Sequence, residues 1–302
     1  MTSSAIHTQD LAKRYGKTVA LRGLSMTVER GQVFGFLGPN GAGKTTAVKL
    51  LLGLARATGG QAWLLGVAAG TIASRRRVGY LPELFRYQPW LTSREVLALH
   101  CELGRVERAA WPAEISRTLE TVGLAARAND RVGTYSKGMQ QRLGLGVALI
   151  GSPELVLLDE PTSALDPVGR YDVRQIMAAL RERGVTVFLN SHLLTEVERV
   201  CDRVAIVDQG VVVATGRVDD LVGEATVRIR ATGLDDAART ALAAFGRVNV
   251  SGDWLRVDGL RDGAVPDVVA EIVRHGGRVY AVEPEHHTLE ERFLELLGEQ
   301  RS

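Results

Sequence analysis

The sequence predicts an α/β fold followed by a smaller α+β unit, and three observations lead to this prediction. Apolar runs short enough for buried strands alternate with helical segments, which is typical of a mainly parallel sheet covered on both faces. One strand–loop–helix junction carries a glycine-rich loop. Past Gly216 the pattern changes to the order βαββαβ, as in a ferredoxin-like unit. We therefore expect one domain over residues 1–218 and a second over 224–302.

The composition limits the possible compartments and partners. The 302 residues, 45% hydrophobic and 24% charged, fit one large or two modest globular domains. A net charge of +2, without a long basic block, predicts no nucleic-acid partner. Cys101 and Cys201 are too few for a disulfide framework and suit a reducing compartment. No signal-peptide pattern occurs, and no apolar run reaches the about 18 residues of a membrane helix. Any membrane part should therefore belong to another polypeptide.

The residues before the glycine-rich loop predict an antiparallel layer of short strands. Gly16 and Gly23 are expected to mark the turns between them, because glycine is a common turn residue. The predicted strands span residues 6–8, 18–21 and 24–28.

The middle of the chain predicts helices inserted between the strands of the parallel sheet. Residues 92–126 are helical in pattern. Ser93 with Glu95 begins one helix, and Pro112 lies in the first turn of another. The strands of this sheet are predicted at 33–37, 77–82, 155–160, 185–189 and 204–207, with a hairpin at 59–66.

The C-terminal unit predicts a small sheet, two helices and a final amphipathic helix over 288–297 that begins with Thr288 as its N-cap. The leucine-rich face of that last helix allows two interpretations. It either braces a dimer or packs onto its own domain. The remaining elements are predicted strands at 226–230, 248–250, 254–257 and 278–282, and predicted helices at 235–245 and 264–275.

The glycine-rich loop fits the phosphate-binding pattern G-x-x-x-x-G-K-[ST]. Glycines let backbone N–H groups approach an anion closely, and the following helix offers its free N-terminal donors to the same anion. Lys44 would reach the β- and γ-phosphates, and the Thr45 hydroxyl would bind Mg²⁺. The predicted binding residues are Gly38, Pro39, Asn40, Gly41, Ala42, Gly43, Lys44, Thr45 and Thr46.

Further polar residues follow the buried strands of the predicted sheet. Asp159 ends one strand, and an acid there is costly to bury unless it has a partner such as Mg²⁺. Glu160 follows it and is positioned to polarise an attacking water. His192 follows the next strand, at the end where parallel-sheet sites form.

Together these motifs resemble the ATP-binding subunit of ABC transporters. Residues 38–46 resemble the Walker A loop, and 155–160 resemble the Walker B strand with its catalytic glutamate. His192 falls at the switch histidine, and Tyr15 at the aromatic residue that stacks on adenine. The D-loop is Ser163, Ala164, Leu165 and Asp166. The signature, usually written LSGGQ, is Tyr135, Ser136, Lys137, Gly138 and Met139.

The resemblance covers about residues 6–216 and implies a P-loop ATPase fold with a helical subdomain. It implies that two subunits pair head to tail, with ATP and Mg²⁺ between the Walker A loop of one and the signature of the other. Ser136 would contact the γ-phosphate across the interface, while His192 would sense it. The C-terminal unit resembles the extension of ABC-2 exporters, which include drug, antibiotic and ion efflux ATPases. A separate transmembrane permease would hold the chain at the cytoplasmic face of the cell membrane.

Three residues depart from the family pattern. Glu83 stands where the family usually has the Q-loop glutamine, and it would be a further candidate ligand of Mg²⁺ through water. Lys137 replaces the first signature glycine, and Met139 replaces its glutamine. These changes bear on the turnover rate rather than on the presence of the catalytic residues.

Three alternatives to a transport ATPase fit parts of the sequence. A soluble ABC-type ATPase acting on a ribosome or DNA is the main one, although such relatives usually carry paired modules or long coiled-coil insertions. A GTP-binding switch lacks support because no [NT]-K-x-D motif occurs. A binding module without catalysis is disfavoured by Glu160.

Overall fold

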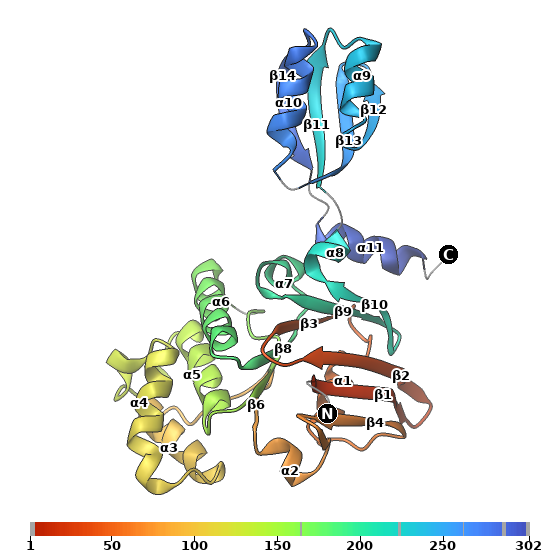
Figure 1. Ribbon diagram of the computed structural model, residues 1–302. Helices are drawn as coiled ribbons and strands as arrows, with labels where there is room; N and C mark the ends of the chain where they lie inside the picture. The colour runs from red at the N-terminus through yellow and green to blue at the C-terminus, as the bar shows by residue number, and fades with distance from the viewer. Residues whose placement is uncertain (1–3, 164, 223–224, 262, 286–287, 300–302) are drawn as a thin grey trace. The chain divides into compact units, whose positions relative to one another are not determined.

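In a computed structural model, the chain is described over residues 4–163, 165–222, 225–261, 263–285 and 288–299. Its contacts divide it after Gly216 into two compact units, which are described separately (Figure 1). None of the described helices combines the length and apolarity needed to cross a bilayer.

The first unit is built on a six-stranded sheet in the order β10-β9-β3-β8-β7-β6. Every pairing from β9 to β6 is parallel, as predicted. β3, β7 and β8 are buried along their whole length, which explains their continuous apolar runs. The strands are β3 (Val33–Leu37), β6 (Val78–Leu81), β7 (Leu155–Asp159), β8 (Thr186–Asn190), β9 (Arg203–Asp208) and β10 (Val211–Arg217).

An antiparallel layer precedes this sheet, but its predicted division into three short strands is wrong. It consists of β1 (Ser4–Tyr15) and β2 (Thr18–Glu29), with β4 (Gly59–Leu64) beside β1 and β5 (Val67–Ala68) beside β4. Gly16 does form a turn, with φ of 57°. Gly23 instead lies inside β2, at a register shift where Leu24 and Arg22 face consecutive residues of β1. It therefore marks a β-bulge, a common position for a strand glycine.

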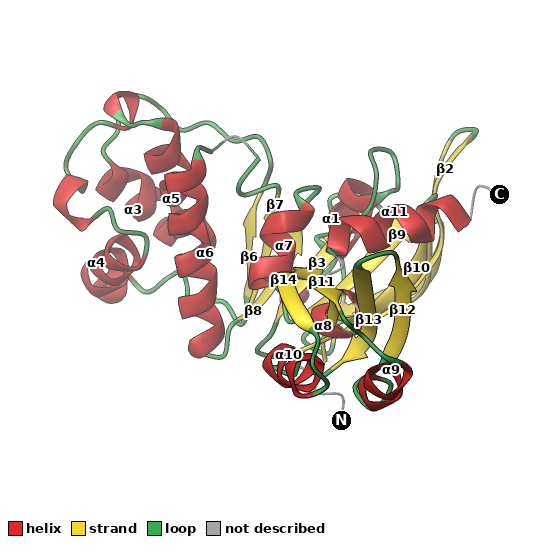
Figure 2. Cartoon of the chain, turned by 90° about the horizontal axis from the view of Figure 1, so that it is seen from above, coloured by secondary structure: helices red, strands yellow, loops and turns green. Residues whose placement is uncertain are grey.

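Helices cover the parallel sheet and form a separate helical group. In that group α3, α4 and α5 pack on one another, on the left of Figure 2. α3 begins at Ser93, as predicted, with Thr92 as its N-cap, and Pro112 lies in the first turn of α4. The helices are α1 (Lys44–Leu51), α2 (Ile72–Arg75), α3 (Ser93–Leu103), α4 (Trp111–Thr121), α5 (Lys137–Leu149), α6 (Pro167–Glu182) and α7 (Leu194–Val200).

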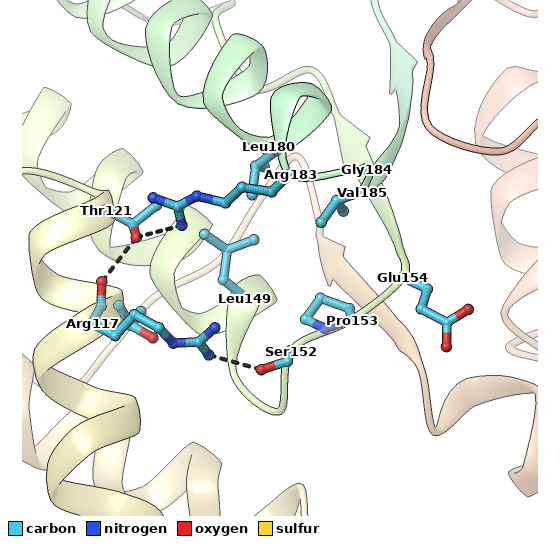
Figure 3. A pocket seen from close by; sticks show the side chains of 11 residues that line it. Arg117, Thr121, Leu149, Ser152, Pro153, Glu154, Leu180, Arg183, Gly184 and Val185 are labelled. Atoms are coloured by element: carbon cyan, nitrogen blue, oxygen red, sulfur yellow. Dashed lines mark hydrogen bonds between the residues drawn. The ribbon is translucent and has the colours of Figure 1, made fainter.

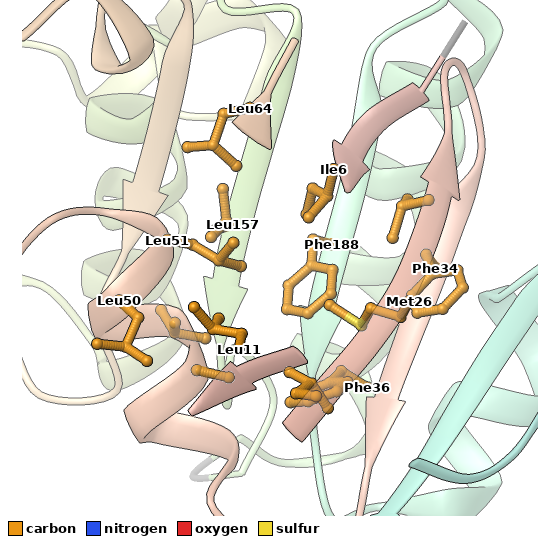
Figure 4. Close-up of a cluster of buried hydrophobic side chains, with 14 of the residues drawn as sticks. Ile6, Leu11, Met26, Phe34, Phe36, Leu50, Leu51, Leu64, Leu157 and Phe188 are labelled. Atoms are coloured by element: carbon orange, nitrogen blue, oxygen red, sulfur yellow. The ribbon is translucent and has the colours of Figure 1, made fainter. Parts of the chain in front are cut away.

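The main core lies between the antiparallel layer and the parallel sheet. Side chains of β1 and β2, such as Ile6 and Met26, face Phe34 and Phe36 of β3 and Phe188 of β8 (Figure 4). The rings of Phe34 and Phe188 stack with their centroids 6.0 Å apart. This cluster fixes β3 and β8, and the functional loops begin at the ends of those two strands.

The second unit has a four-stranded antiparallel sheet in the order β12-β13-β11-β14, which is the expected ferredoxin-like arrangement. Apolar residues of α9 and α10 complete its core. The hydroxyl of Thr288 caps α11 by accepting from Glu291 N, as predicted. Its elements are α8 (Val218–Val222), β11 (Ala225–Thr232), α9 (Asp236–Leu242), β12 (Arg247–Ser251), β13 (Trp254–Leu260), α10 (Val265–Arg274), β14 (Arg278–Glu285) and α11 (Leu289–Glu299).

The apolar face of α11 contributes to its own unit. α11 packs against α8, and Leu289 and Leu297 are buried. This favours the interpretation that the leucine-rich face packs within its own domain.

Candidate active site

The glycine-rich loop joins β3, at the centre of the sheet, to α1. A Cβ on Gly38 would lie 2.2 Å from the carbonyl oxygen of Val207, so no larger residue fits there. Gly43 has φ of 100°, and a Cβ there would lie 2.4 Å from the carbonyl oxygen of Ala20. Gly43 is also the N-cap of α1 without a side-chain cap, which leaves donors of the first turn available to an anion.

Lys44 lies buried inside this loop. Its Nζ donates to the carbonyl oxygens of Gly38 at 2.6 Å and Pro39 at 3.3 Å. Burial lowers the pKa of Lys44, while the charges of Glu160 and Asp159 act in the opposite direction. The ammonium is thus already held where a phosphate oxygen could compete with two neutral carbonyls for it.

Asp159 is buried at the end of β7, directly opposite Asn190 at the end of β8. Asn190 Nδ2 donates to Asp159 Oδ1. Burial raises the pKa of Asp159, and this hydrogen bond opposes the rise. Asn190 Oδ1 is buried without a hydrogen-bond partner in the described part of the chain. No motif in the sequence assigns a role to Asn190, although its position at the end of a parallel strand is a usable signal.

Glu160 directs the chain sharply away from β7. Its φ of 52° is uncommon for a residue other than glycine, and such conformations gather at functional sites. Its backbone N–H donates to the carbonyl oxygen of Asn190 at 2.8 Å. His192 Nδ1 lies 2.8 Å from Glu160 Oε2. The candidate base and the candidate sensor are therefore in direct contact.

One cleft of about 410 Å³ brings most of the predicted residues together. Asp159 is buried next to it, hydrogen-bonded to Asn190 of its wall. Tyr15 does not line the cleft: it is 46% exposed, and Lys13 Nζ lies 4.7 Å from its ring centroid. The lining consists of Thr18, Val19, Ala20, Pro39, Asn40, Gly41, Gly43, Lys44, Thr45, Thr46, Glu83, Glu160, Asn190 and His192.

The oxygen atoms around this cleft fit Mg²⁺, a hard cation that prefers oxygen ligands. Asp159 supplies a carboxylate, Thr45 a hydroxyl, and Asn190 an acceptor that has no partner among the described residues. Within the described ranges no three acidic, histidine or cysteine side chains form a metal cage. Such an ion would therefore share its ligands with phosphate and water, as Mg²⁺ commonly does. Glu83 also lines the cleft, and its charge opposes the lowering of the pKa of Lys44.

The signature residues line a different cleft, of about 430 Å³, together with part of the D-loop. Ser136 caps α5 by accepting from Met139 N at 3.2 Å, and Asp166 caps α6 by accepting from Gly169 N at 2.8 Å. Ala164 lies outside the described residues, and Ser163 Oγ donates to the carbonyl oxygen of Glu160. The lining is Ser136, Lys137, Gly138, Met139, Arg142, Leu165, Asp166, Val168, Gly169 and Asp172.

Tyr135 differs from the rest of the signature because it is buried. Its hydroxyl is hydrogen-bonded to the carbonyl oxygen of Arg127 at 2.6 Å and to Ser93 Oγ at 3.0 Å. It therefore anchors the start of α5 inside the helical group and does not face the cleft.

Comparison with known proteins places these motifs in a family. The family model of the ABC transporter matches residues 21–163. An uncharacterized ABC transporter ATP-binding protein of Nostoc is 40% identical over 99% of this chain and 91% of its own length. A linearmycin resistance ATP-binding protein of Bacillus subtilis is 32% identical over 97% and 98%. A fluoroquinolones export ATP-binding protein of Mycobacterium tuberculosis is 37% identical over 99% and 95%.

Solved structures share this fold over most of the chain. An ATP-binding subunit of an ABC transporter, 29% identical, covers 72% of this chain and 92% of its own, with a TM-score of 0.65.

Proposed function

This chain belongs to the ATP-binding subunits of export-type ABC transporters, and from that premise we propose that it hydrolyses ATP to drive a separate membrane permease. The relatives named for linearmycin resistance and fluoroquinolone export support an efflux role. The transported compound would then be selected largely by the permease.

The separation of the two clefts is the observation that carries this proposal. The phosphate-loop cleft and the signature cleft share no lining residue. One chain would therefore bind the triphosphate on one side only. We propose that two copies pair head to tail, so that Ser136 and Gly138 of one copy cover the ATP held by the phosphate loop of the other. ATP would then hold the dimer together, and hydrolysis would release it.

The residues of the phosphate-loop cleft suggest their roles in hydrolysis. The backbone donors of the loop and Lys44 would bind the phosphates, which neutralises charge as the γ-phosphoryl leaves. Thr45 and Asp159, directly or through water, would hold Mg²⁺, which supplies further charge stabilisation. Glu160 would accept a proton from the attacking water, and His192 would orient Glu160 through their contact at 2.8 Å.

The permease needs a surface on this chain, and we propose a groove between α2 and the end of α3. Ile72 is 72% exposed and Leu103 is 69% exposed, and arginines stand beside both. Exposed apolar side chains with a basic rim fit a permease loop that carries apolar and acidic residues. The arginines are Arg75, Arg76 and Arg105.

The test is a Glu160→Gln variant compared with the wild-type chain. Hydrolysis should fall at least about tenfold while MgATP still binds, because a general base is lost but the phosphate contacts remain. Light scattering should then show a doubled mass with MgATP. The control is Glu182→Gln, which changes an exposed glutamate of α6 and should alter neither property. Undiminished hydrolysis in Glu160→Gln would contradict the assigned base.

A second measurement tests the transport role. The tagged Glu160→Gln chain would be recovered from detergent-solubilised native membranes with MgATP, and co-purified proteins would be identified by mass spectrometry. A polytopic membrane protein is expected, and Leu103→Asp should reduce its recovery without changing ATP-dependent dimerisation. Recovery of ribosomal or DNA-bound proteins alone would point to the soluble alternative.

A further inference from the structure

A cavity of about 310 Å³ opens between α4, the end of α5 and the end of α6 (Figure 3). It shares no lining residue with either cleft described above. Its volume lies at the lower end of the range of about 300–1,000 Å³ that is usual for small-molecule sites. The floor is apolar, and the rim carries Arg117 from α4 and Arg183 from the end of α6. The apolar lining residues are Leu149, Pro153, Leu180 and Val185.

The rim offers more hydrogen-bond donors than acceptors. Arg183 Nη1 donates to Thr121 Oγ1 at 3.2 Å, and the Thr121 hydroxyl in turn donates to the carbonyl oxygen of Arg117 at 2.8 Å. The Arg117 guanidinium donates to Ser152 Oγ at 2.9 Å. These two hydroxyl oxygens thus already accept, and a third lining hydroxyl, that of Thr118, has no hydrogen-bond partner in the described part of the chain. Each guanidinium has about five N–H donors to offer. The group that complements this rim is an acceptor.

The net charge of the rim indicates how much negative charge the bound acceptor group should carry. Arg117 is paired with Glu114, and Glu154 is held by two other arginines outside the cavity at 2.8 and 2.5 Å. Arg183 forms no ion pair with any carboxylate in the described part of the chain. It caps α6, whose C-terminal end carries about half a negative charge. The remaining positive charge therefore suits one carboxylate rather than a polyphosphate.

We propose that this cavity binds a small monocarboxylate with an apolar body. Its carboxylate accepts from Arg183 and Arg117, and its apolar part rests on the leucines and valine of the floor. A molecule bound there would connect α4 of the helical group with α6, which packs on β8 of the central sheet.

The test uses 4-fluorobenzoate as the probe, titrated into the full-length chain without nucleotide and followed by ¹⁹F NMR. Saturable binding is expected, with a dissociation constant on the order of 1 mM, which is usual for a ligand of this size. Arg183→Gln should weaken it about tenfold, because a hydrogen bond to a charged group is lost. The matched control is Arg181→Gln on the same helix, whose side chain pairs with Asp202 instead.

A neutral probe separates the carboxylate from the apolar body. 4-Fluorobenzyl alcohol should bind more weakly than 4-fluorobenzoate to the wild-type chain and should be insensitive to Arg183→Gln. Equal melting temperatures of the variants would show that the fold is intact. The proposal is overturned if 4-fluorobenzoate shows no saturable binding, or if it binds Arg183→Gln and the wild-type chain equally.

Discussion

Lys44 and Asp159 are both buried beside the phosphate loop, and burial shifts their pKa values in opposite directions. It lowers the pKa of the ammonium and raises that of the carboxyl, so burial disfavours both charges. Hydrogen bonds offset this cost: Lys44 uses two carbonyls, and Asp159 uses the amide of Asn190. A ligand that carries phosphate and a cation would offset the cost of burying both charges, because phosphate pairs with Lys44 and the cation with Asp159.

Asn190→Ala should test this balance. Asp159 would lose its donor while it stays buried, so we expect the free energy of unfolding to fall by about 1–3 kcal/mol. Urea unfolding of the chain without nucleotide measures this. Asn249→Ala is a control, because the Asn249 amide donates at 3.3 Å to the partly exposed Asp258 of the second unit. Loss of this hydrogen bond should lower the free energy of unfolding less. Equal losses in the two variants would contradict a special role of Asn190.

His192→Ala should separate the orientation of Glu160 from nucleotide binding. His192 contacts Glu160 Oε2, whereas the phosphate loop is formed by other residues. We therefore expect hydrolysis to fall at least about tenfold with the affinity for MgATP nearly unchanged. Steady-state hydrolysis and calorimetric titration measure the two quantities. His275→Ala, in the second unit, should leave both unchanged, and a large loss of MgATP affinity in His192→Ala would argue against the assigned role.

At the scale of elements, two of the three glycines of α5 have opposite requirements. A Cβ on Gly144 would lie 2.7 Å from Phe85 Cζ and 2.8 Å from Leu81 Cδ1, whereas Gly138 has only Ser136 Oγ nearby, at 3.9 Å. Gly144→Ala should therefore lower the free energy of unfolding by about 1–3 kcal/mol through overpacking. Gly138→Ala should leave it unchanged or raise it by up to about 1 kcal/mol, because alanine favours helix.

Gly138→Ala should weaken ATP-dependent dimerisation even though it does not lower the stability of the fold. Under the proposed function, Gly138 lets the start of α5 approach the ATP of a second copy, and a methyl group would obstruct that approach. We expect weaker ATP-dependent dimerisation by light scattering in a chain that melts no earlier than wild type. A Gly138→Ala chain that dimerises normally would remove Gly138 from the interface.

The capping box of α3 predicts a dependence of stability on pH. The backbone N–H of Thr92 donates to the Glu95 carboxylate at 2.7 Å and its hydroxyl at 2.9 Å, and these bonds lower the pKa of Glu95. The folded-state pKa is thus below the unfolded one. The stabilisation by Glu95 is complete above the ordinary glutamate pKa and is lost as the pH falls through the lowered value.

Glu95→Gln should therefore lower the melting temperature at pH 7, and this effect should be smaller at about pH 3, because the stabilisation by the Glu95 charge is lost as the pH falls. Thermal unfolding followed by circular dichroism at the two pH values measures this. Glu102→Gln, at an exposed position of the same helix, should have little effect at either pH. A pH-independent effect of Glu95→Gln would assign it to packing rather than to the charge.

The elements that could be predicted from the sequence are those whose residue types are compatible with few local structures. The apolar run of β3, the glycines of the loop and the acid that ends β7 agree closely with the prediction. Gly23 was misassigned because a glycine in a bulge and a glycine in a turn look alike without the partner strand. Asn190 acquires its role only through pairing with Asp159, a contact across 31 positions of the chain.

At the scale of the whole molecule, the candidate site residues lie in two separate clefts. In the sequence, only the family resemblance indicates this separation. Spacing along the chain places both the phosphate loop and the signature near strand and helix ends. It does not reveal that they line separate clefts. That separation depends on where α5 packs against β6 and α6 against β8, which is a tertiary property.

The second unit gives the last prediction. Because α11 packs on α8 and buries Leu289 and Leu297, its apolar face is used within its own unit and has less surface left to brace a dimer. The contacts divide the chain after Gly216, so a chain of residues 1–216 should keep the whole phosphate-loop and signature clefts. With Glu160→Gln and MgATP, this shortened chain should double its mass in light scattering as the full chain does. If it instead stays monomeric while still binding MgATP, the second unit takes part in dimerisation, through α11 or another surface.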